Sequence, residues 1–169
     1  MRELKSIDPS EITDNPFRLI GKDWMLITAG DLNKYNTMTA SWGALGVLWN
    51  KNTSTIYVRP TRYTYEFLEK IDYYTLSFFS EEYRPALNFC GANSGKTLNK
   101  AKETVLTPVQ GEYGVFFRQS RLVLECKKIF YTDLAPGNFL DKTADATYYP
   151  KKDYHRIYIG EILSCLVKE

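Results

Sequence analysis

Short runs of β-branched and aromatic residues, separated by turn residues, recur along the chain and constrain its fold more than any other feature. Aromatic residues make up 15% of the chain, and such side chains fit a pleated, half-buried surface. A closed or partly closed barrel satisfies this pattern better than a parallel sheet, which would need a helix after nearly every strand. We expect about six or seven strands. They lie within residues 17–27, 38–49, 53–58, 73–79, 113–117, 121–131 and 156–167. Residues 17–27 are expected to form a hairpin that turns at 21–23, and residues 113–117 to pair with 121–131.

Helical spacing of apolar residues is confined to short stretches between these strands. It predicts helices over residues 63–71 and 83–90, and it leaves a further short helix open over 93–102. Residues 30–36 are expected to form a polar loop, and residues 133–153 a long insertion of mixed aromatic and polar character. The chain is therefore expected to be mainly β with helical insertions.

The length of 169 residues suits one domain with a single core. We find no internal repeat, low-complexity tract or linker, so the predicted domain spans residues 1–169. Residues 1–15 are polar and punctuated by proline, which predicts an irregular N-terminal arm.

Composition excludes several classes of function. The net charge is +2, from 22 basic and 20 acidic residues, which gives no reason to expect a nucleic-acid partner. Three separated cysteines and one histidine argue against a disulfide framework and a metal site. Neither a secretory signal nor an apolar run of membrane-spanning length is evident, so we expect a cytoplasmic protein without a membrane partner.

Three segments carry residues that could bind a phosphorylated aromatic ligand. The first, residues 36–43, reads Asn-Thr-Met-Thr-Ala-Ser-Trp-Gly. Small and hydroxylated residues cluster there at the expected start of a strand, where backbone amides and hydroxyls can bond the polar edge of a planar ring. The alternative is an ordinary strand start with a core tryptophan.

The second segment, residues 59–64, reads Arg-Pro-Thr-Arg-Tyr-Thr and joins an expected strand to an expected helix. Arginine offers a bidentate donor fork and threonine a hydroxyl, so the segment suits a phosphate, as does a helix N-terminus. The alternative is a solvated basic turn.

The third segment, residues 91–97, reads Gly-Ala-Asn-Ser-Gly-Lys-Thr. It lacks the first glycine of a P-loop and follows a helix instead of a strand, which excludes the nucleoside-triphosphatase interpretation. A small-residue loop with one lysine remains, and the alternative is an ordinary surface loop. His155, just before the last strand, is a weak catalytic candidate, because a lone histidine is more often structural.

Together these residues resemble the flavin reductase-like, FMN-binding split-barrel family, particularly its flavoredoxin branch. The resemblance rests on residues 36–43, on Tyr-Val-Arg-Pro-Thr-Arg-Tyr-Thr-Tyr-Glu at 57–66, on Leu-Ser-Phe-Phe at 76–79 and on Ile-Gly-Glu-Ile at 159–162. The order and separation of the four segments also match, so the resemblance covers roughly residues 15–165.

The resemblance implies a Greek-key split β-barrel that forms a homodimer with FMN near the subunit interface. Residues 38–43 would hold the isoalloxazine, Arg59 and Thr64 the phosphate, and Ser94 and Lys96 would approach the ribityl-phosphate end. The full set of implied FMN contacts is Met38, Thr39, Ala40, Ser41, Trp42, Gly43, Arg59, Arg62, Tyr63, Thr64, Ser94 and Lys96.

The expected function is an FMN-binding oxidoreductase, either an NAD(P)H-dependent flavin reductase or a flavoredoxin-like electron carrier. A flavin supplies the redox chemistry itself, which agrees with the lack of a nucleophile–base constellation. The sequence has no Gly-x-Gly-x-x-Gly fingerprint, so NADH or NADPH would dock transiently, and the electron acceptor is not indicated. The alternatives are a non-catalytic flavin store or sensor and, with less support, a split barrel that oxidises a pyridoxine phosphate or binds haem.

Overall fold

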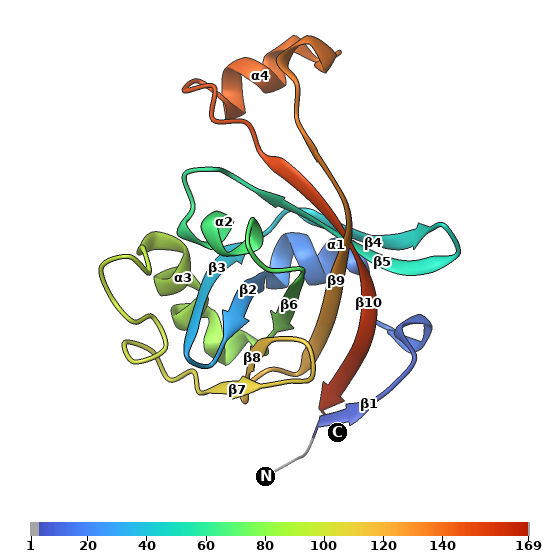
Figure 1. Cartoon of the computed structure of the whole chain (residues 1–169), viewed down its shortest axis with the longest axis vertical. Coiled ribbons are helices and arrows are strands. Elements are labelled where there is room, and N and C mark those ends of the chain that lie inside the picture. The colour runs from blue at the N-terminus through green and yellow to red at the C-terminus, as the bar shows by residue number, and fades with distance from the viewer. Residues whose placement is uncertain (1–3, 169) are drawn as a thin grey trace.

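The computed structural model describes residues 4–168, and one large antiparallel sheet dominates it (Figure 1). The strands follow the order β3-β2-β6-β9-β10-β5-β4, with β1 added to β10. Their bounds are β1 (Leu4–Ser6), β2 (Met25–Asp31), β3 (Lys34–Ala40), β4 (Gly43–Leu48), β5 (Lys51–Val58), β6 (Tyr73–Phe78), β9 (Leu122–Asp133) and β10 (Arg156–Lys168). Two short strands, β7 (Pro108–Gln110) and β8 (Val115–Phe117), form a separate ribbon. The expected mainly β architecture is confirmed.

The hairpin predicted over residues 17–27 is wrong in its first half. Asn15 accepts hydrogen bonds from the backbone N–H groups of Phe17 and Arg18 and so caps the short helix α1 (Pro16–Arg18). Proline at the first helical position suits this start because it has no N–H to leave unpaired. The helix continues as a π-helical turn over Leu19–Asp23, and only then does β2 begin.

The polar loop predicted over residues 30–36 is also wrong, because β2 and β3 pair directly as a hairpin there. The Asp31 carboxylate accepts the N–H groups of Asn33 and Lys34, a side-chain turn that closes the hairpin over Leu32 and Asn33. The exposed polar residues of this stretch lie in and beside the turn, whereas Asn36, Thr37 and Met38 in β3 are buried.

The predicted pairing of residues 113–117 with 121–131 does not occur. β8 pairs with β7, while β9 pairs with β6 on one edge and with β10 on the other. Both edges of β9 are therefore occupied by strands far away in the sequence, which a local pattern does not reveal.

Two helices stand where the sequence predicted them. They are α2 (Tyr63–Leu68) and α3 (Arg84–Ala92), the latter entered through a 3-10 turn over Glu81–Tyr83. Residues 93–102 contain turns but no helix. None of the helices within residues 4–168 is long and apolar enough to cross a membrane.

The insertion between β9 and β10 projects beyond one end of the sheet (Figure 1). It holds a 3-10 turn over Pro136–Asn138 and the helix α4 (Lys142–Tyr148). Phe139, Tyr149 and Tyr154 pack their rings together with centroids 5.0–5.8 Å apart. This aromatic cluster gives the insertion a small core of its own.

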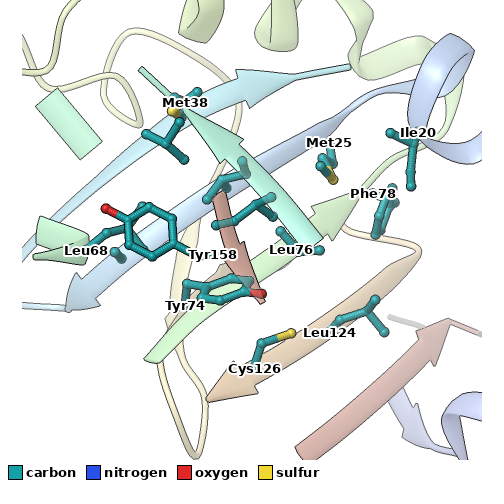
Figure 2. Packing of buried hydrophobic residues seen from close by; sticks show 14 of the residues in the cluster. Ile20, Met25, Met38, Leu68, Tyr74, Leu76, Phe78, Leu124, Cys126 and Tyr158 are labelled. Carbon is teal, nitrogen blue, oxygen red and sulfur yellow. The ribbon is translucent and has the colours of Figure 1, made fainter. Parts of the chain in front are cut away.

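The main core lies between the strands, and Figure 2 shows side chains from several of them converging there. Tyr74 on β6 is fully buried, and its hydroxyl bonds the Ser54 hydroxyl on β5 at 2.7 Å. Burial raises the pKa of the Tyr74 phenol well above its usual value. The ring fits because residue 160 on β10 is a glycine, since a Cβ there would overlap the Tyr74 ring.

We therefore predict that Gly160→Ala lowers the free energy of unfolding by about 1–3 kcal/mol, because the added methyl overpacks a dense core. Chemical denaturation measures the change. Gly46→Ala is the matched control, since a Cβ at this strand glycine has no neighbour within 4 Å. Equal stability of the two variants would contradict the packing of Tyr74 against Gly160.

Candidate functional site

The strand start predicted at residues 36–43 is wrong, because these residues end β3 and form its link to β4. The end of β3 and this link line a cavity of about 190 Å³, here called the β3 cavity. Residues 38–42 form one side, and Tyr57, Arg59 and His155 form the other. The Thr39 hydroxyl donates to the carbonyl of Leu87 in α3, which anchors this end of β3. Five of the six ring-binding residues expected from the sequence thus line one cavity.

Gly43, the sixth, lines an adjoining apolar cavity instead. A Cβ at this position would lie 2.9 Å from the backbone oxygen of Thr55. The glycine is therefore explained by the close approach of β4 to β5.

A second cavity of about 140 Å³, here called the α2 cavity, lies next to the first and shares Met38 with it. Arg62, Tyr63 and Thr64 line it from the start of α2, and Ser94 lines it from the loop after α3. Thr64 is buried and its hydroxyl accepts from the Asn36 amide at 2.8 Å, which ties α2 to β3. The structure thus brings together four of the residues expected near a phosphate.

Lys100 also lines the α2 cavity, and sequence reasoning did not single it out. Its side chain is buried, and its ammonium donates to the carbonyls of Thr37 and Cys90 at 2.8 and 2.7 Å. Burial lowers the pKa of Lys100 to about 8. An ammonium has three N–H donors, so one remains for a ligand. Nothing local distinguishes Lys100 from its exposed neighbour Lys102 in the sequence.

Lys96 lies outside the α2 cavity and lines a neighbouring polar cavity of about 450 Å³. Its ammonium forms an ion pair with Glu66 at 2.5 Å and lies 5.2 Å from the centre of the Tyr63 ring. The residue is exposed, and the Glu66 carboxylate raises its pKa. A role for Lys96 at the phosphate stays a prediction, with Lys100 better placed in the α2 cavity.

Arg59 lies in the β3 cavity and not beside Arg62 and Thr64. Its guanidinium pairs with Asp153 at 2.7 Å and donates to the backbone oxygen of Tyr148 at 2.8 Å. Both partners belong to the insertion region, so Arg59 attaches that region to the end of β5. The phosphate role expected for Arg59 stays a prediction. In the structure, Arg59 lines a different cavity from Arg62 and Thr64.

His155 is buried at the wall of the β3 cavity. Its Nδ1 bonds the Tyr149 hydroxyl at 2.7 Å, and its ring centre lies 5.3 Å from that of Trp42. Burial, assisted by the nearby Arg59 charge, lowers the pKa of His155 to about 4. The imidazole is therefore neutral at pH 7 and supplies no positive charge to the cavity.

Neutral and cationic groups divide between the two cavities. The β3 cavity has hydroxyl, backbone and aromatic groups, with its one arginine already paired to a carboxylate. The α2 cavity has Arg62, Lys100 and the hydroxyls of Thr61 and Ser94. This donor set fits a ligand with a planar polar ring at one end and a phosphate at the other.

One family of known proteins matches this chain. The model of the flavin reductase like domain family matches residues 17–169. Comparison with curated proteins finds no match.

Several solved structures share the fold. An FMN-binding domain of a flavin reductases-like enzyme from Shewanella baltica OS155 has a TM-score of 0.71 and 16% identity, over 99% of this chain and 78% of that one. Flavoredoxin from Methanosarcina acetivorans has a TM-score of 0.68 and 20% identity, over 96% and 77%. An NADH:FAD oxidoreductase from Streptomyces globisporus has a TM-score of 0.63 and 16% identity, over 94% and 84%. These likenesses confirm the expected split-barrel fold.

The depressed pKa makes a direct prediction for the only histidine of the chain. In the folded protein the imidazole should titrate with a midpoint near pH 4, against about 6.5 in the unfolded chain. The unfolded state then binds more protons between these values, so stability is complete above about pH 6.5 and is lost as the pH falls toward 4. Imidazole NMR shifts followed with pH, with and without urea, measure both midpoints. A folded-state midpoint near 6.5 would contradict the buried, neutral ring.

Proposed function

The chain belongs to the flavin reductase-like family, and from that premise we propose that it binds FMN and passes electrons from NADH or NADPH to an acceptor. Family membership supports a flavin-related oxidoreductase in general. That the flavin is FMN, and that NADH or NADPH donates the electrons, is our proposal.

The observation that carries this proposal is the adjacency of the β3 and α2 cavities. They share Met38, and the first is neutral whereas the second holds two cationic side chains, Arg62 and Lys100. The isoalloxazine of FMN is planar and uncharged when oxidised, and its phosphate is anionic. A single FMN would therefore match both cavities in only one orientation.

In this proposal the phosphate is held by Arg62 and Lys100, with hydroxyl donors from Thr61 and Ser94. Arg62 is positioned by a hydrogen bond of 3.1 Å to the carbonyl of Gly91, so one end of its donor fork is fixed. Two charge-assisted donors on a phosphate are stronger than neutral ones.

At the other end, the backbone of residues 38–42 would bond the polar edge of the ring. Bound FMN supplies hydride and single-electron chemistry, and the protein has to bind, orient and shield it. The neutral imidazole of His155 keeps a second positive charge out of the β3 cavity, and Arg59 is neutralised by Asp153.

The proposal predicts that protein purified with FMN shows a bound flavin band that bleaches on anaerobic addition of NADH or NADPH. The nucleotide that bleaches the band faster defines the donor. A bound flavin that stays oxidised with both nucleotides would instead identify a flavin store or sensor. Absence of bound flavin would overturn the proposal.

A variant at Arg62 tests the orientation of FMN in the same assay. Arg62→Ala should weaken FMN binding by about 1.5–3 kcal/mol, through loss of a charge-assisted contact. Riboflavin has no phosphate, so its affinity should change little. Arg118→Ala is the matched control, since this exposed arginine lines neither cavity. Equal losses for FMN and riboflavin would place Arg62 away from the phosphate.

We also propose that the chain forms a homodimer, with support from the turn between β4 and β5. Trp49 in this turn is 62% exposed and has φ 52°, a left-handed conformation that is unfavourable for bulky residues. Asparagine and glycine suit such two-residue hairpin turns. The ring of Phe130, also exposed, lies 6.4 Å from that of Trp49. Two exposed aromatic rings, one of them in an unfavourable turn position, are typical of a contact surface.

Trp49→Asn should therefore convert the dimer to a monomer without loss of fold, because asparagine tolerates the left-handed turn better. Light scattering coupled to size exclusion gives the molar mass, and circular dichroism checks the fold. Leu140→Asn is the matched control, as this exposed apolar residue belongs to the insertion, which lies away from the β4–β5 hairpin (Figure 1). A monomeric parent chain, or a dimeric Trp49→Asn variant, would contradict the proposed interface.

A further inference from the structure

An apolar cavity of about 540 Å³ adjoins the β3 cavity and shares Ser41, Trp42 and Tyr57 with it. Its walls come from α1, from the start of β4 and from the base of the insertion. A volume of this size is typical of small-molecule sites. The cavity therefore opens beside the ring end of the proposed flavin site.

The lining of this apolar cavity contains no charged side chain. Arg59, which lines the β3 cavity, is paired with Asp153 and does not line this space. An anionic ligand would lose its hydration here without gaining a counter-charge, which is unfavourable. The lining thus selects against charged molecules.

Aromatic rings form much of the wall. Phe17, Trp42, Tyr57 and Tyr149 all border the cavity. Phe17 is 87% exposed, so its ring is open to a ligand. Rings of this kind stack well on a flat molecule.

Two hydroxyl groups at the shared boundary can recognise a polar atom. Within residues 4–168, neither the Ser41 nor the Tyr57 hydroxyl has a hydrogen-bond partner, whereas the Tyr149 hydroxyl is bonded to His155. A free hydroxyl can donate to a carbonyl oxygen. The boundary with the flavin site thus offers donors where the reacting end of a ligand would lie.

We infer that this apolar cavity binds the electron acceptor and that the acceptor is a neutral, planar carbonyl compound of the quinone class. The inference rests on the proposed function for its source of electrons. The net reaction is NAD(P)H plus quinone plus one proton, giving NAD(P)⁺ plus hydroquinone. The nicotinamide gives up two electrons and one proton as hydride, and the proton consumed from solution is the second, so both quinone carbonyls become hydroxyls.

Binding can be tested without turnover, by equilibrium dialysis of naphthoquinone against FMN-loaded protein in the absence of NADH and NADPH. The ring-sulfonated derivative of naphthoquinone keeps the planar ring system and adds a negative charge, and serves as the charged comparison ligand. We expect the neutral compound to bind at least about tenfold more tightly, since burial of an unpaired charge is costly. Covalent capture by thiols is disfavoured because the three cysteines are buried. Equal affinity of the two compounds would overturn the inference.

A blocking variant locates the bound compound. Ala44 lines the apolar cavity on the edge strand β4, so Ala44→Trp should fill part of it and weaken naphthoquinone binding about tenfold or more. Val105→Trp is the control, because Val105 is exposed, lies outside the cavity and is not on the β4–β5 hairpin. Both variants should still bind FMN and be bleached by NADH or NADPH, which tests the proposed function separately. Unchanged naphthoquinone affinity in Ala44→Trp would overturn the site. A changed molar mass of Ala44→Trp, with naphthoquinone still bound, would also overturn it and would assign the cavity to a second copy of the chain.

Discussion

The link between β3 and β4 is the constraint on which the rest of the structure depends. Only Ser41 and Trp42 separate the two strands, yet β3 and β4 occupy opposite ends of the sheet order. In a flat sheet these strands would be about 29 Å apart, at roughly 4.8 Å for each neighbouring pair. The link can span only about 11 Å, so the sheet has to curl until its ends meet. The short link thus enforces a barrel, and the β3 cavity forms where the ends approach.

The same closure explains why residues distant in the sheet order share a site. Residues 38–42 come from one end of the sheet, whereas Tyr57 and Arg59 come from the end of β5. Inside the barrel, Tyr74 on β6 reaches past Gly160 on β10 to Ser54 on β5. This bond crosses from one half of the sheet to the other, so the core and the site depend on the same curvature.

Sequence patterns were sufficient where the controlling interactions are local. Strands within 53–58, 73–79 and 156–167 and the helix at 63–71 follow from their own periodicity and stand as expected. The Asn15 cap and the Asp31 turn are local too, but each depends on a side chain bonding to backbone, which apolar spacing does not report. The partner of β8 and the burial of Lys100 are set by long-range packing.

For the site, the sequence singled out segments that line neighbouring cavities in the structure, but it did not indicate how the structure divides them. Arg59 and Arg62 belong to one short basic run. The Arg59 side chain, just after β5, donates to the backbone of the insertion, whereas Arg62 stands at the start of α2. Asp153 neutralises the first, whereas Arg62 lies beside Lys100 with no carboxylate partner within residues 4–168. Cationic character therefore falls off from the α2 cavity through the β3 cavity to the uncharged apolar cavity. A ligand with one anionic end and one neutral planar end has a single favourable direction along this series.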